Sequence, residues 1–199
     1  MSDPVRITRG SRAFRAASFA LFLAGFSTFS LLYCVQPLLP IFADAFHVSP
    51  ASSALPMSLA TAPLAFAILA AAALSEGWGR RGLMFVAMGL ASLLTIAASL
   101  TTDWTLFVAL RALAGLALGG VPAVAMTWLA EELDPADAAR TTGLYVAGTA
   151  FGGMSGRIVT GVLTEWLEWR PAIAIMGILG LAAAIGFRLL LPPSKHFIR

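Results

Sequence analysis

Charged side chains inside long apolar stretches are the first candidates for chemistry in this sequence. Arg111 lies within the apolar run 104–130, and Arg157 lies near the far end of the run 138–163. A charge at the centre of a membrane-spanning helix costs about 2.5–3.5 kcal/mol on insertion scales, so it usually has a use. We expect Arg111 to have a functional role. A structural arginine that donates to backbone carbonyls or to a lipid headgroup is the open alternative.

A second group of polar side chains lies in the first apolar run. Tyr33 and Gln36 share one helix face with Phe29, at spacings of four and seven residues, and Pro37 and Pro40 follow them. Polar groups in lipid turn toward the bundle interior or a cavity, and prolines bend a helix. We expect Tyr33 and Gln36 to line a substrate cavity, with ordinary packing as an equal alternative.

Nucleophilic chemistry has little support. The segment 153–156 reads G-M-S-G, which with several spans is typical of intramembrane serine proteases. Ser155 would need an adjacent base, yet the histidines are His47, in a loop, and His196, in the tail. The single cysteine, Cys34, excludes an internal disulfide and a multi-cysteine metal site. We therefore expect no enzyme, no metal and no cofactor, and keep the protease as a remote alternative.

Glycines recur at the spacing of a helix face. Gly148, Gly152 and Gly156 are four residues apart, and so are Gly115 and Gly119. Side chains at this spacing lie on one face, where small residues let a neighbouring helix approach closely. We expect these glycines to form helix-packing interfaces.

The elements that position these residues must be membrane helices. The chain has 199 residues, of which 59% are hydrophobic and 12% are charged. A span needs about 20 apolar residues, and the runs predict six helices, at 16–42, 50–75, 83–100, 104–130, 138–163 and 171–191. The net charge of +3 comes from scattered basic residues without a groove-sized patch, so we expect no nucleic-acid partner. The sequence predicts an all-α membrane protein built as a six-helix bundle.

The arginines and lysines indicate the orientation of this bundle. Basic residues occur before the first run, after the second and fourth runs and after the sixth, whereas Arg170 is the one basic residue on the opposite side. By the positive-inside rule both termini are cytoplasmic. We expect residues 1–15 and 192–199 to be cytoplasmic segments of a multi-pass protein, with 192–199 as a tail or the start of a linker.

A polar island between the second and third runs carries a family resemblance. Residues 74–81 read L-S-E-G-W-G-R-R, and Glu76, Gly79, Arg80 and Arg81 resemble part of the pattern G-x-x-x-D-R-x-G-R-R of major facilitator superfamily transporters. In that family this loop follows helix 2 and holds the cytoplasmic side shut through charge pairs. The resemblance implies a cytoplasmic gate here, with the acidic pair 131–132 as partner. A solvated loop that only sets topology is the alternative.

Two further stretches extend the resemblance. Arg111, Gly115, Gly119 and Gly120 resemble the helix 4 pattern R-x-x-Q-G-x-G, in which the arginine faces the central cavity and acts in substrate or proton coupling. Residues 143–161 resemble the antiporter signature of helix 5 and are similar to that helix in YnfM-like transporters, an efflux-type group of inner-membrane proteins. There the glycine strip faces the other six-helix half and forms a sliding contact.

The resemblance covers nearly the whole chain and implies the N-terminal half of a twelve-helix transporter. The implied function is efflux of a small molecule by alternating access, coupled to protons, in a bacterial inner membrane. Its partners would be the lipid bilayer, a small-molecule substrate and a second six-helix half, supplied by a C-terminal half or a second copy. No carboxylate lies deep in a run, since Asp44 and Glu76 are at helix ends. A six-helix membrane partner that moves no solute is the alternative from another class.

Overall fold

The computed structural model describes residues 6–193, and for residues 71–78 it describes the helix but not the side chains. The elements in chain order are α1 (Arg12–Tyr33), η1 (Gln36–Leu38), α2 (Leu39–Ala45), α3 (Pro50–Ser53), α4 (Leu55–Trp78), α5 (Arg80–Leu100), α6 (Trp104–Leu118), α7 (Pro122–Glu132), α8 (Pro135–Trp166) and α9 (Trp169–Leu190).

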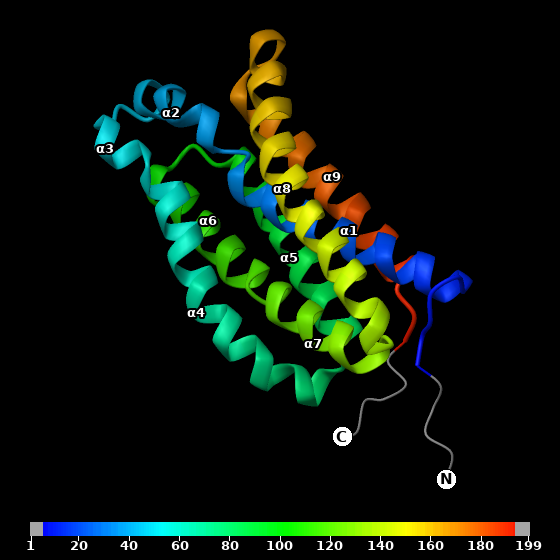
Figure 1. Ribbon diagram of the computed structural model, residues 1–199. Coiled ribbons are helices and arrows are strands. Elements are labelled where there is room, and N and C mark those ends of the chain that lie inside the picture. Colours follow the sequence, from blue (N-terminus) through cyan, green and yellow to red (C-terminus); the bar gives the residue numbers. More distant parts are fainter. Residues whose placement is uncertain (1–5, 194–199) are drawn as a thin grey trace.

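Within the described residues these elements form a bundle of six rods. The first rod joins α1, η1 and α2, the short α3 precedes α4, and α6 and α7 together make the fourth rod. The start of α1 and the end of α9 lie at the same end of the bundle (Figure 1). We call this the inner end, and the end with α2 and α3 the outer end.

Two rods are broken where the sequence removes backbone hydrogen bonds. Pro37 lacks an N–H, and α1 gives way to the 3₁₀ turn η1 at this point. The run 104–130, expected as one helix, divides at Gly119 and Gly120, and Pro122 begins α7. Proline at the first turn of a helix costs nothing, because its missing N–H has no intrahelical partner there. Each rod can therefore change direction without leaving the bundle.

Side-chain caps set several helix starts. Ser11 Oγ accepts from Phe14 N at 3.0 Å before α1, and Asp103 Oδ1 accepts from Leu106 N at 2.7 Å before α6. Such caps satisfy N–H groups that have no intrahelical acceptor. Between α4 and α5 the chain reverses at Gly79, which has φ 80°, a conformation that side chains disfavour.

Glycines bring the helices together in three close pairs. Gly152 of α8 contacts α1, Gly115 of α6 contacts α4, and Gly177 of α9 contacts α5. A Cβ built on Gly152 would lie 2.2 Å from Phe26 O, and one on Gly115 would lie 1.9 Å from Ala60 O. Backbones can approach this closely only without a side chain between them.

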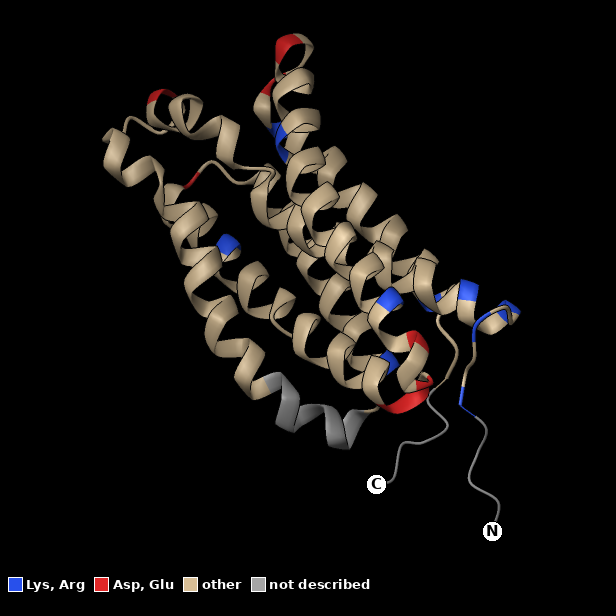
Figure 2. Ribbon diagram, viewed as in Figure 1, with Lys and Arg blue, Asp and Glu red and all other residues tan. Residues whose placement is uncertain are grey.

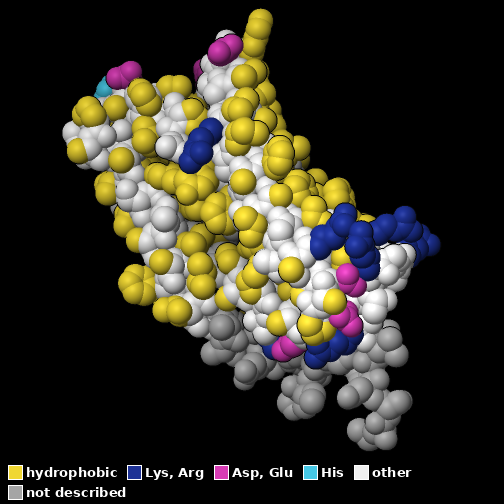
Figure 3. Space-filling model, in the orientation of Figure 1, with side chains coloured by type: hydrophobic (Ala, Val, Ile, Leu, Met, Phe, Trp, Pro, Cys, Tyr) yellow, Lys and Arg dark blue, Asp and Glu magenta, His cyan; other side chains and the backbone are white. Residues whose placement is uncertain are grey.

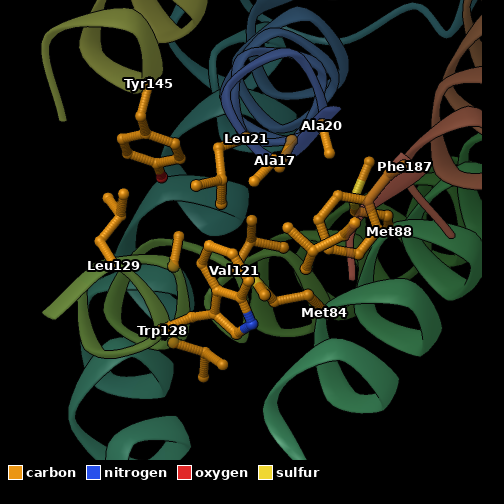
Figure 4. Close-up of a cluster of buried hydrophobic side chains, with 14 of the residues drawn as sticks. Ala17, Ala20, Leu21, Met84, Met88, Val121, Trp128, Leu129, Tyr145 and Phe187 are labelled. Atoms are coloured by element: carbon orange, nitrogen blue, oxygen red, sulfur yellow. The ribbon is translucent and has the colours of Figure 1, made fainter. Parts of the chain in front are cut away.

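Buried apolar side chains fill the bundle at the inner end. There Trp128, Leu21, Met84 and Phe187 belong to one cluster drawn from α7, α1, α5 and α9. Figure 4 shows these side chains directed toward one another between the helices. At the outer end Phe42 meets the ring of Phe107 with centroids 4.9 Å apart. The two clusters fix the rods at both ends.

The outer surface is apolar, as a lipid-embedded bundle requires. Leu69 and Phe66 on α4 are 76% and 74% exposed. Charged residues gather at the two ends of the bundle, and hydrophobic side chains cover much of the visible face between them (Figures 2 and 3). In the described residues four rods are long and apolar enough to span a membrane: 12–45, 80–100, 104–132 and 169–190. The described apolar part of α4 is shorter, and α8, at 32 residues, is rich in glycine and threonine and is less apolar. The predicted all-α membrane bundle is confirmed.

Candidate functional site

Tyr33, Gln36 and Arg157 form one polar cluster where α8 crosses the break in the first rod. The Nε of Arg157 donates to Oε1 of Gln36 at 2.6 Å. Its guanidinium carbon lies 4.3 Å from the centre of the Tyr33 ring, a cation–π distance. Arg157 and Gln36 are exposed. The sequence analysis singled out all three residues but did not predict that they lie together, because Arg157 is 121 positions from Gln36.

Arg111 lies on the other side of the same helix end. Its Nη2 donates to the carbonyl oxygens of Leu31 and Leu32, each at 3.0 Å. These carbonyls belong to the last turn of α1, where intrahelical donors are missing. The side chain is 1% exposed. Its Nε and Nη1 have no hydrogen-bond partner among the described residues. Arg111 thus holds the broken end of α1 through Nη2 alone.

At the inner end, Arg80 and Glu131 form an ion pair. Both carboxylate oxygens of Glu131 accept from the Arg80 guanidinium, in the fork geometry of a bidentate pair. The Arg80 side chain is 8% exposed and that of Glu131 30%. Arg81 donates to the backbone carbonyl of Arg188 in α9. The pair joins the start of α5 to the end of α7, within this bundle. The side chain of Glu76, the remaining expected gate residue, lies outside the described residues.

The N-terminal segment is fastened to the connector between α7 and α8. Ile7 N donates to Glu132 O at 2.9 Å, and Asp134 N donates to Ile7 O at 3.2 Å. Arg9 N donates to Oδ2 of Asp137 at 2.7 Å. The segment before the first span was expected only as a basic terminus. Backbone pairing of one residue leaves no periodic pattern in sequence that could have revealed it.

The glycine strip of α8 lies against α1 of the same chain, which corrects the expected sliding contact with another half. Cβ atoms built on Gly148, Gly152 and Gly156 would lie 2.2 to 2.5 Å from backbone oxygens of α1. Gly115 and Gly119 likewise meet α4. The spacing predicted a close helix approach correctly, but periodicity does not say which helix approaches. The strip is internal packing.

The geometry does not favour a protease. Ser155 lines a small pocket of about 40 Å³ between α1, α8 and α9, together with Ser27, Ser30 and apolar side chains. Cys34 Sγ is buried and donates to Leu31 O at 3.2 Å. His47 lies in the loop after α2. Among the described residues, no group of His, Cys, Asp and Glu is arranged to hold a metal ion.

Comparison with known proteins gives the family. The model of the Major Facilitator Superfamily matches residues 20–199. The chain belongs to this superfamily. It is 45% identical over 191 residues to the inner membrane transport protein YnfM of Escherichia coli (strain K12), an alignment that covers 96% of this chain and 46% of YnfM. It is 33% identical over 120 residues to the puromycin resistance protein pur8 of Streptomyces alboniger, covering 58% of this chain and 23% of that protein.

Solved structures show the same fold. A bacterial homolog of the human lysosomal transporter Spinster, in an inward-facing and unoccupied conformation, superposes with a TM-score of 0.77 at 18% identity. The match covers 94% of this chain and 45% of the Spinster homolog. The chain thus spans about half the length of YnfM and of the Spinster homolog, and it is a membrane-embedded member of a family of transporters.

Proposed function

We propose that the chain acts as one six-helix half of a secondary transporter in a bacterial inner membrane. The observation that carries the proposal is the 45% identity to an inner membrane transport protein across 96% of the chain. Major facilitator transporters place two six-helix halves around a central site near the bilayer midplane. The chain supplies one wall of that site, and a second half supplies the other.

The broken outer part of the first rod supplies the substrate-facing groups in this proposal. Arg157, Tyr33 and Gln36 are joined and reach the surface of the bundle. Arg111 sets the position of the carbonyls beneath them. The unused Nε and Nη1 of Arg111 give it donors for a substrate or a second-half residue once the cavity opens. Alternating access would then be a rocking of the two halves about this site.

The direction of transport in the proposal is efflux. Similarity to a puromycin resistance protein over 120 residues supports export of small molecules. The Arg80–Glu131 pair, on the inner and cytoplasmic side, stiffens the connection between α5 and α7. Proton coupling would draw its carboxylate from the second half or from Asp44, since the described acidic residues of this chain lie toward the ends of the rods.

A chimeric transporter tests the proposal. The aligned 191 residues of E. coli YnfM are replaced by this chain, and cells that lack YnfM express the chimera. Accumulation of a panel of labelled organic solutes is then measured. The proposal predicts lower accumulation of at least one solute than in cells with an empty vector, and loss of the difference when the proton gradient is collapsed. Equal accumulation of every solute, with the chimera present in the membrane, would overturn it.

A further inference from the structure

A groove between α1 and α8 at the inner end has no part in the transport proposal. It has a volume of about 420 Å³ and is open to the outside of the bundle. Its lining residues come from the first turns of the two helices: Phe14, Arg15, Ser18, Phe19, Phe22, Arg140 and Leu144. The hydroxyl oxygen of Ser18, one of these residues, lies 3.2 Å from that of Thr141 in α8.

Two arginines, Arg15 and Arg140, belong to the lining of this groove. Arg15 and Arg140 are both exposed. Among the described residues neither forms an ion pair, and the ion pair at this end joins Arg80 to Glu131. Asp137, one turn before Arg140, accepts the backbone N–H of Arg9. Both side chains line the same groove, and like charges on one groove repel each other unless an anion lies between them.

The rest of the groove is apolar and exposed. Phe19 is 54% exposed and Leu144 is 38% exposed. The rings of Phe19 and Phe22 are stacked with centroids 6.2 Å apart, and the ring of Phe151 lies 6.4 Å from that of Phe22. Phe22 lies seven residues beyond Arg15, or about 10 Å farther along the helix at 1.5 Å per residue. The groove is therefore basic at its mouth and aromatic along its depth.

We propose that this groove binds an anionic phospholipid. The phosphate lies between Arg15 and Arg140, where guanidinium groups form charge-assisted hydrogen bonds to phosphate oxygens. One acyl chain lies along Phe19, Phe22 and Leu144. Basic pockets between membrane helices are suited to acidic headgroups. The aromatic wall extends about 10 Å along α1, so an acyl chain that runs inward from the membrane interface can lie against it. Figure 3 shows dark-blue side chains gathered beside yellow ones at this end of the visible face.

The occupant follows from the shape and charge of the groove together. A free phosphate would use the arginines but leave the aromatic wall uncovered. An apolar segment of another protein would cover the wall but leave two charges unpaired. An anionic phospholipid satisfies both parts, and the bilayer supplies it at the depth where the groove opens.

Native mass spectrometry and lipid titration of the detergent-solubilised 199-residue chain test the proposal. The probes are phosphatidylglycerol, phosphatidylcholine and inorganic phosphate. The expected result is retention of phosphatidylglycerol in preference to phosphatidylcholine, with no displacement by millimolar phosphate. Each arginine that contacts the bound acidic headgroup contributes about a five-fold gain in binding, so Arg15→Gln with Arg140→Gln should weaken retention about 25-fold.

Two variants separate the site from general surface charge. Arg188→Gln removes an exposed inner-end arginine of α9 that does not line the groove, and it should leave phosphatidylglycerol binding unchanged. Phe19→Ala should weaken binding of the long-chain lipid more than binding of a short-chain phosphatidylglycerol. A thermal melt checks that each variant is folded. Equal loss in Arg188→Gln, equal retention of phosphatidylcholine, or displacement by phosphate would each overturn the proposal.

Discussion

Gly152 of α8 and Phe26 of α1 are in backbone contact: a Cβ on the glycine would lie 2.2 Å from the Phe26 carbonyl oxygen. This relationship fixes the distance between two of the most closely packed rods of the bundle. It also determines which face of α8 remains for lipid, substrate or a second half.

Replacing Gly152 by alanine should destabilise the bundle. The added methyl group meets backbone, which cannot rotate away, and overpacking of this kind costs about 1–3 kcal/mol. The matched control is Gly143→Ala in the same helix, where a Cβ meets nothing within 4 Å. Alanine there should instead stabilise the helix by about 0.5–1 kcal/mol. Thermal unfolding in detergent measures both, and equal melting temperatures for the two variants would contradict the close contact.

The Arg80–Glu131 pair should stabilise the inner end. Arg80→Gln leaves Glu131 with weaker donors, and hydrogen bonds to charged groups contribute about 1.5–3 kcal/mol. A double-mutant cycle with Glu131→Gln should give a coupling energy of about 1 kcal/mol or more, because the two groups contact each other directly. If the effects of the two changes on the free energy of unfolding are additive, the ion pair does not stabilise the bundle, and the loop serves only to set the membrane topology.

Arg111 should be needed for both folding and export. Arg111→Met removes the donor of the Leu31 and Leu32 carbonyls, and leaving buried acceptors unsatisfied costs about 1–3 kcal/mol. Arg111→Lys restores one donor group and should recover part of that stability. In the chimera, export should remain impaired with lysine, because the donors of an ammonium lie on one nitrogen and lack the planar fork that directs Nη2 to the carbonyls and leaves Nε and Nη1 for a second partner. Full export by Arg111→Ala would remove its proposed role.

Arg157 should affect transport more than stability. It is exposed, so Arg157→Gln should change the free energy of unfolding by no more than about 0.5 kcal/mol. In the chimera the same change should raise the KM for export, because the cluster with Tyr33 and Gln36 loses its charge. Arg170 is a matched control at the outer end, since its guanidinium lies 4.2 Å from the Trp169 ring and it donates to Thr101 O. Arg170→Gln should leave the KM unchanged. If Arg157→Gln also leaves the KM unchanged, the proposed contact of Arg157 with the substrate is excluded.

The fold class could be predicted from the sequence because apolar runs of spanning length have few other uses. Pro37 and Pro40 predicted the bend in the first rod. The break at Gly119 was less evident, since a run of apolar residues looks the same whether or not its backbone is continuous. α8 extends over residues 135–166, beyond the expected 138–163, because Asp134 caps it and Pro135 begins it.

The candidate site was predictable by residue but not by arrangement. Arg111 could be singled out from the sequence alone, because it is a charged residue inside the long apolar run 104–130. Its acceptors, the carbonyls of Leu31 and Leu32, are backbone groups 80 and 79 positions away and have no signature in sequence. The glycine spacing likewise predicts a close helix contact but does not indicate that α1 is the partner. These contacts depend on how the helices are aligned against one another, and the local sequence pattern of one helix does not specify that alignment.

Solute flux in proteoliposomes tests the central claim most directly. The chain is reconstituted alone and together with a separately expressed second six-helix half from YnfM, at matched protein density, and uptake of the solute identified with the chimera is followed across an imposed proton gradient. The proposal predicts flux when two halves are present and its loss on Arg111→Ala. An assembled pair of halves that moves no solute would contradict it.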